Sequence, residues 1–508
     1  MFSLRRLLLA LAALLIGTAI VAPVALIWSA LYTTGGLQFA IRHLPRQLGP
    51  VQLDIVGVSG TVADGLTVER VEIDHDLVHL KFEGIEGHVA LMPLLLQTIR
   101  VGHGSVRSAL IQVKRRTLPS TPGAPVFMPR WLIISAEQGR VGSATLTVPN
   151  GFRLDATDIS GAAVIRHHVI RFFQAEGLLG GEARVSAIGD LIAADPLGLE
   201  VKGRILWSPA GQPAWTVAGS ARGDLNILHI VAHTDSPFRA DLSGQALDLT
   251  DRWHWVGDAV VRDFNLRAWG VSGPLGSITG HLAGSGDATG FSAHGPVNPT
   301  GLRAGMFETQ FSGRYADRVL TAKHLEVHHP GSGARASGAG TIGIDGPRLD
   351  LSGEVSNFRW PLVGRDPALS GASGSFTLAG LLPYRVRLSG SARAAGLPLM
   401  PLEVNGTLGK DSFGFDTAEI DLFGGHASVS GQVVWSPQES WSVAGRVAAI
   451  NPGALRPDLP GSVSFMLGAS GRGLDTRGDL TAAFDSLSGK LRVSSKLFFN
   501  FSVKRQHV

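Results

Sequence analysis

Residues 348–355 read RLDLSGEV, and this stretch shows the pattern that decides the fold. Its apolar residues alternate with polar or charged ones: Leu349, Leu351 and Val355 against Arg348, Asp350, Ser352 and Glu354. Successive side chains of a β-strand point to opposite faces, whereas the apolar residues of a surface helix recur every three or four positions. The stretch therefore predicts a strand with one apolar face and one polar face.

The same alternation recurs along the chain. In residues 197–207 it sets Leu197, Leu199, Val201, Ile205 and Trp207 against Glu200, Lys202 and Arg204, and in residues 418–422 it sets Ala418, Ile420 and Leu422 against Glu419 and Asp421. Turn signals separate such stretches, at Ala63-Asp64-Gly65, Asp345-Gly346-Pro347, Gly424-Gly425, Pro452-Gly453 and Pro460-Gly461. Short strands between regularly spaced turns are typical of all-β proteins, so we predict a repetitive all-β body.

Composition excludes several classes of protein. The chain has 508 residues, of which 17% are charged and 65 are glycine, and it contains no cysteine. A disulfide scaffold, a cysteine-ligated metal and a thiol nucleophile are therefore excluded. The net charge of +4 is too small over this length to indicate nucleic-acid binding.

An apolar segment near the N-terminus predicts a membrane anchor. Residues 7–31 contain no charge, and this length is sufficient to cross a bilayer. Arg5 and Arg6 precede the segment, which predicts a cytoplasmic N-terminus and an exported body. A cleaved signal peptide is the alternative, but its apolar core is normally shorter and ends at a small-residue cleavage site. We expect a single-pass membrane protein, with the anchor represented by Leu7, Leu15, Val21 and Leu31.

The sequence suggests five regions. We expect a cytoplasmic tip and anchor (1–35), a β-rich segment with one short helix (36–117), a proline-rich loop (118–130), a repetitive β body (131–490) and an atypical C-terminal tail (491–508). The short helix is predicted near residues 91–99, with Pro93 in its first turn. The tail lacks glycine and is rich in lysine and phenylalanine, unlike the rest of the chain. A truncated or frame-shifted product would explain this ending.

An internal repeat supports the repetitive body. Residues 201–220 read VKGRILWSPAGQPAWTVAGS and residues 429–446 read VSGQVVWSPQESWSVAGR. The Trp-Ser-Pro at 207–209 matches that at 435–437, and Trp215 matches Trp441. Repetition of this kind is typical of proteins built from stacked structural units, in which each unit buries its apolar face only against the neighbouring units.

Local motifs then connect the sequence to a known family. After the apolar segment come GVSGT at 57–61, LTVE at 66–69, PLLL at 93–96, LFGG at 422–425, SG at 430–431, VWSP at 434–437, INPG at 450–453 and LPG at 459–461. In these motifs and their order, the sequence resembles the N-terminal portion of the TamB family. TamB proteins are inner-membrane components of the translocation and assembly module and are similar to AsmA-like, bridge-like lipid transfer proteins.

The resemblance implies an elongated, curled β-sheet with an apolar groove that carries phospholipid between the inner and outer membranes. It also implies an alternative function, as a scaffold for outer-membrane protein insertion or secretion together with a TamA-type barrel. Neither function needs an enzyme's catalytic residues or a cofactor. The candidate groove residues follow from alternation: Leu199, Val201, Ile205, Trp207, Leu349, Leu351, Val355, Ile420, Leu422, Val429 and Val433. Alternation alone does not separate an open groove from the closed core of a sandwich or filled solenoid, because both bury one face.

Motifs for other functions are weak. Residues 338–343 match the glycine pattern of a dinucleotide site, but Pro347 follows soon after, where that site requires a helix. His324 and His328 have the spacing of metal ligands on a helix, yet residues 323–329 read better as a strand. A polysaccharide-active β-helix enzyme would need an acidic or metal cluster, which we do not find in the sequence.

Overall fold

The computed structural model describes residues 29, 32–43, 46–48, 51–75, 78–90, 98–114, 133–149, 151, 153–192, 196–208, 213–265, 276–300, 305–343, 348–394, 396–435, 438–454, 457, 461–472, 475–486 and 496–503. Nearly all of these residues lie in β-strands, so the predicted all-β class is confirmed. The chain divides into two compact units. Unit 1 comprises Met1–Ser208, Ala214–His233 and Ser243–Trp255, and unit 2 comprises Pro209–Pro213, Thr234–Leu242 and Val256–Val508.

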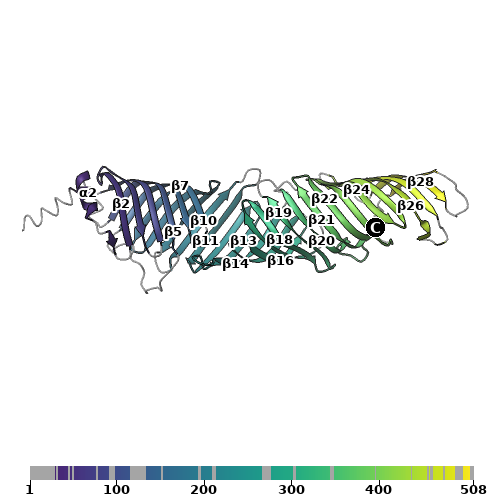
Figure 1. The fold of residues 1–508 in the computed structure, drawn as a ribbon, viewed down its shortest axis with the longest axis horizontal. Helices are drawn as coiled ribbons and strands as arrows, with labels where there is room; N and C mark the ends of the chain where they lie inside the picture. Colours follow the sequence, from purple (N-terminus) through teal and green to yellow (C-terminus); the bar gives the residue numbers. More distant parts are fainter. Residues whose placement is uncertain are drawn as a thin grey trace, which may run out of the picture. The chain divides into compact units, whose positions relative to one another are not determined.

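In unit 1, each strand pairs with the next one along the chain (Figure 1). All of these pairs are antiparallel except β5 with β6, which is parallel. The strands are β1 (Gln47–Leu48), β2 (Val51–Thr61), β3 (Gly65–Asp74), β4 (Val78–Ala90), β5 (Thr98–Val113), β6 (Ile133–Thr147), β7 (Arg153–Arg166), β8 (Val169–Leu179), β9 (Ala183–Ile192), β10 (Gly198–Trp207) and β11 (Trp215–Asp224).

Three strands have residues in both units: β12 (Ile227–Ser236), β13 (Ala240–Leu247) and β14 (His254–Asn265). In unit 2, β15 to β29 again pair in chain order, and every pair is antiparallel. The first of them are β15 (Ser277–Asp287), β16 (Phe291–Pro299), β17 (Phe307–Ala316), β18 (Val319–His329), β19 (Ala334–Gly343), β20 (Leu349–Trp360), β21 (Leu369–Gly380) and β22 (Tyr384–Ala394).

The remaining strands of unit 2 are β23 (Leu399–Leu408), β24 (Ser412–Leu422), β25 (Gly425–Val434), β26 (Ser440–Ile450), β27 (Ser462–Arg472), β28 (Asp475–Ser486) and β29 (Lys496–Val503), and a 3-10 turn, η3, lies at Pro452–Ala454. Figure 1 shows these strands in green to yellow, following one another in chain order. Pairing of consecutive strands needs only short connections, which explains the regular spacing of turn residues in the sequence.

The turn signals and the internal repeat both correspond to hairpins. Turns occur at 62–64, between β2 and β3, and at Phe423–Gly424, between β24 and β25. One copy of the repeat forms the hairpin of β10 and β11, and the other forms the hairpin of β25 and β26. In the first hairpin Trp207 pairs directly with Trp215, whereas in the second Trp441 pairs with Val433. The repeat is therefore a recurring hairpin, one in each unit.

The described α-helix lies elsewhere than predicted. Most of the predicted helix near 91–99 falls outside the described residues, but Thr98 and Ile99 belong to strand β5, so the prediction was wrong for its last two residues. A helix that we did not predict, α2, spans Thr34–Arg42. Thr33 caps it, because the Thr33 side chain accepts a hydrogen bond of 3.0 Å from the Gly36 amide.

Two other predicted regions fall outside the described residues, namely the proline-rich loop (118–130) and almost all of the apolar segment (7–31), with its residues Leu7, Leu15, Val21 and Leu31. Within the described ranges, no helix is long and apolar enough to cross a membrane.

Candidate functional site

The strand register places the apolar residues of unit 2 on one face of its sheet. Directly opposed residues of neighbouring strands point to the same face, so a row of partners can be followed from strand to strand. The row through Leu351 continues over seven further strands as Leu378, Val386, Gly406, Phe415, Gly431, Val443 and Ala469. Every residue in it is apolar or glycine, and we call this side the apolar face of unit 2.

On each of β20 to β23, the neighbouring position lies on the opposite face and is polar. The row through Ser352 contains Thr377, Arg387, Asn405 and Thr417. On β20, one step from Leu351 to Ser352 thus separates the apolar row from the polar row. We call this second side the polar face of unit 2.

Unit 1 has the same arrangement. Two rows of partners are wholly aliphatic: Leu53, Ile73, Leu80, Ile111, Leu146 and Leu154, and Ile134, Ile165, Ile170, Leu191 and Leu199. Beside the second row, on the opposite face, lie the charged partners Arg171, Asp190, Glu200 and Arg222. The aliphatic rows form the apolar face of unit 1.

Ion pairs occupy the polar face. The Arg171 guanidinium donates two hydrogen bonds of 2.7 Å to the Asp190 carboxylate, one from Nε and one from Nη2. This bidentate contact lowers the pKa of Asp190 and raises that of Arg171. In unit 2, Arg387 Nη2 lies 2.6 Å from Glu403 Oε1 on the corresponding face. Charges paired there leave the apolar faces free of them.

Glycines on the apolar face of unit 2 mark a tight approach between strands. Gly374 and Gly390 are direct partners in β21 and β22. A Cβ atom built on Gly374 would collide with the Ser389 carbonyl oxygen and would lie 2.6 Å from the Gly390 Cα. On the polar face, a Cβ on Gly468 would meet nothing within 4 Å. Neighbouring backbone thus crowds the apolar side and leaves the polar side open, as in a sheet that curls towards its apolar face.

Aromatic rings cover some of these glycines. A Cβ atom added at Gly353 would lie 2.9 Å from a ring carbon of Phe376, and one added at Gly431 would lie 3.1 Å from a ring carbon of Phe415. The ring replaces the side chain that the glycine lacks, a known way to stabilise glycine within a sheet.

The candidate groove residues lie where alternation predicted, in β10, β20, β24 and β25. In unit 2, one row of the apolar face joins Val355 to Ile420 through Gly374, Gly390 and Leu402. Val429 pairs with Ala418 and Val433 pairs with Phe413 on the same face. In unit 1, Trp207 contacts Trp215 across the hairpin, with ring centroids 6.2 Å apart.

None of the eleven candidates is buried. Ile205 is 38% exposed and Val433 is 44% exposed, and the other nine are of intermediate exposure. Among the described residues, no large side chain is fully buried, and the buried apolar residues are mostly alanines. One small cluster is sealed, where Leu362 of the β20–β21 loop and Ala334 pack with Phe307 and Phe358. In the described part of each unit, the apolar face is therefore not packed as a closed core.

Sequence reasoning missed members of the same face, notably Phe376 and Leu378. They lie in residues 369–380, LSGASGSFTLAG, where small residues occupy both faces and weaken the alternation. The remaining evidence for a strand with an apolar face was that Phe376 and Leu378 are large apolar residues two positions apart. Apolar residues also occur on the polar face, for example Ile188, which pairs with Lys202.

The other motifs carry no assembled chemistry. Residues 338–343 lie inside strand β19, so they do not form the strand-to-helix turn that a dinucleotide site requires. His324 Nε2 lies 3.5 Å from Glu326 on the polar face of β18, and no group of three His, Asp or Glu residues in the described ranges is arranged to hold a metal ion.

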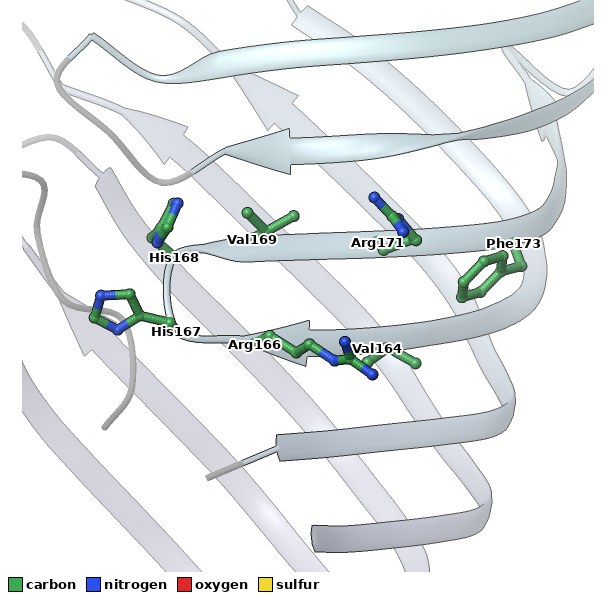
Figure 2. A pocket seen from close by; sticks show the side chains of 7 residues that line it. All are labelled: Val164, Arg166, His167, His168, Val169, Arg171 and Phe173. Atoms are coloured by element: carbon green, nitrogen blue, oxygen red, sulfur yellow. The ribbon is translucent and has the colours of Figure 1, made fainter. Parts of the chain in front are cut away.

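A basic cavity lies at the hairpin of β7 and β8. Figure 2 shows His167 and His168 at the turn, with Arg166 on β7 and Arg171 on β8 beside them. Asp190 already binds Arg171, so part of this positive charge is neutralised.

The fold and the two apolar faces define a class of protein: all-β, made of consecutive strands that present one apolar and one polar face. Residues 333–493 match the family described as TamB, N-terminal domain, and this match confirms the resemblance stated above. No curated protein and no solved structure matches the chain. The matched residues run from β19 to β28 and include the row from Val355 to Ile420. The family indicates a protein of the cell envelope.

Proposed function

We propose that this chain is a membrane-anchored periplasmic protein whose apolar faces shelter the acyl tails of phospholipids on their way between the inner and outer membranes. The observation that carries the proposal is the uncovered row of apolar partners across β20 to β27, with the charged side chains on the opposite face. Such a face needs no catalytic residue, metal or cofactor.

The energetics favour this function. Burial of a CH₂ group is worth about 0.8 kcal/mol, so exposing one sixteen-carbon tail to water costs roughly 13 kcal/mol. An apolar face that replaces the bilayer removes most of this cost. Discrimination between successive positions must be weak for the lipid to move, and the row of apolar side chains and glycines from Leu351 to Ala469 contains no polar side chain that would hold it at one place.

Crosslinking tests the proposal. A photo-crosslinking residue at Ile205 (unit 1) or Leu351 (unit 2) is expected to capture phospholipid in cells. The matched controls are their neighbours Arg204 and Ser352, which lie one step along the same strands on the opposite face. Folded variants at Ile205 and Leu351 that capture no more lipid than the controls refute the lipid-carrying face.

The alternative function, a scaffold for outer-membrane proteins acting with a TamA-type barrel, gives a different result. In that case the same crosslinkers capture nascent protein in place of lipid. On depletion of the chain, insertion of outer-membrane proteins then fails before lipid transport does. The lipid-carrying function predicts the reverse order.

A further inference from the structure

We propose that helix α2 lies in the membrane interface, with Phe39 in the boundary between headgroups and acyl chains and with Arg42 and Arg46 at the lipid phosphates. This inference depends on the membrane anchor of the proposed function, but not on lipid being carried by the apolar faces.

The two sides of α2 differ in their environment. Leu37 is buried, while Thr34 Oγ1 donates a hydrogen bond of 3.0 Å to the Gly60 carbonyl and Gln38 Nε2 donates one of 3.2 Å to the Val58 carbonyl. Successive helical residues are about 100° apart, so Phe39 lies roughly opposite Leu37 and points away from the sheet. Phe39 is 52% exposed, which makes it a largely exposed apolar side chain on an otherwise docked helix.

The chain before α2 indicates what covers Phe39. The 25 uncharged residues 7–31 end two residues before Thr33, so the bilayer surface lies within a few residues of the start of the helix. At Thr33 the backbone is extended, with φ −131° and ψ 139°, and this breaks the helical direction. A side chain at position 36 would collide with the Ser29 carbonyl oxygen, so the turn between the two segments is tight. Tyr32, which is 46% exposed, stands at this turn.

Charge around α2 complements an anionic surface. No acidic residue occurs before Asp54, whereas Arg42 and Arg46 are both exposed. His43 stacks on Phe39 with ring centroids 4.1 Å apart, which orders the apolar side chain towards the exposed side. Phe39 is followed by Arg42 at the end of the helix and by Arg46 beyond it, and an exposed aromatic side chain with basic residues close by suits an interface with anionic headgroups. A bilayer containing anionic lipid therefore fits this surface.

Helix α2 also contacts β2, the first long strand of the apolar face of unit 1. Side chains of α2 donate hydrogen bonds to two carbonyl groups along this strand. An open strand edge is a template for unwanted pairing, and the helix covers this one. With α2 in the interface, the start of that face is held at the bilayer surface.

Site-specific labelling tests the placement. The chain contains no cysteine, so Phe39→Cys in the full chain provides a single site for an environment-sensitive fluorophore. The protein is reconstituted into vesicles of phosphatidylethanolamine and phosphatidylglycerol, and quenchers are attached to the lipid acyl chains. Lys202→Cys, at an exposed position of β10 on the polar face, is the control. We expect blue-shifted emission and strong quenching at position 39, and neither at position 202.

The outcomes are distinguishable. Equal quenching at positions 39 and 202 in vesicle-bound protein overturns the placement of α2, and protein that does not float with the vesicles overturns both this placement and the membrane anchor. Replacing Arg42 and Arg46 with glutamine should reduce quenching at position 39 in vesicles with phosphatidylglycerol. The same reduction in phosphatidylcholine vesicles with no anionic lipid would refute the role of charge. Lipid capture at Ile205 or Leu351 reports on the lipid-carrying face independently of all these results.

Discussion

Adding one methyl group at Gly374 tests whether the sheet of unit 2 curls towards its apolar face. Gly374 faces Gly390 across β21 and β22, and the new Cβ of Gly374→Ala would collide with the Ser389 carbonyl oxygen and lie 2.6 Å from the Gly390 Cα. These are backbone atoms, so the clash is relieved only if the two strands move apart.

Overpacking of this kind costs about 1–3 kcal/mol. In a body of repeated strands, the cost falls first on local opening of the neighbouring strands and not on the whole chain. Amide hydrogen exchange is therefore the suitable assay. A free energy of 1–3 kcal/mol corresponds to roughly 5- to 150-fold faster exchange for the amides of β21 and β22.

Gly468→Ala is the matched control. Gly468 also lies within a strand of unit 2, but on the polar face, where a Cβ meets nothing within 4 Å. We expect exchange there to be unchanged or slower, because alanine restricts the unfolded chain more than glycine does. Wild-type exchange rates in β21 and β22 of Gly374→Ala, or equal effects of the two substitutions, would refute the curl.

Two further substitutions test local features of unit 2. Leu362→Ala should destabilise the β20–β21 loop by about 2–5 kcal/mol, because it leaves a cavity in the sealed cluster with Ala334. Limited proteolysis of the loop measures this effect. The control is Val363→Ala, at an adjacent position that is 56% exposed, and it should leave cleavage unchanged. His426 donates to Asp421 (2.8 Å) and Glu419 (2.9 Å), and the Asp421 carboxylate is the main cause of its raised pKa. A raised pKa in the folded state stabilises the fold at pH values below the unfolded pKa of about 6.5, and this contribution is lost as the pH rises through the folded pKa. His426→Gln should therefore lower Tm at acidic pH and have little effect at alkaline pH. An NMR titration placing the His426 pKa at or below 6.5 would contradict this.

The sequence was sufficient to place strands such as β10, β20 and β24. Their alternation is a local property of the chain, since a side chain's face depends only on its position along its own strand. Turn residues are equally local, and the turn before Gly425 was predicted from its glycines. The alternation also identified Leu349, Leu351 and Val355 as members of one face.

Helix α2 was not predicted, because its formation depends on tertiary contacts as well as on its own residues. Its first turn, TGG, contains two glycines, which disfavour a helix. The helix depends on the Thr33 cap and on the contacts that Thr34 and Gln38 make with carbonyl groups of β2, which lie 26 and 20 residues further along the chain. Tertiary contacts outweigh intrinsic propensity in such a segment.

The sequence by itself determined the all-β class, the position of many strands, and the presence of an apolar and a polar side on each of them. Only the tertiary structure decided which strands pair and in which register. That register joins Val355 to Ile420 on one face and places the Gly374 and Gly390 backbones in contact. The physical reason is that alternation is the same whether an apolar side is covered or open. Coverage depends on residues distant in the sequence, and in the described part of the chain they leave this side partly exposed.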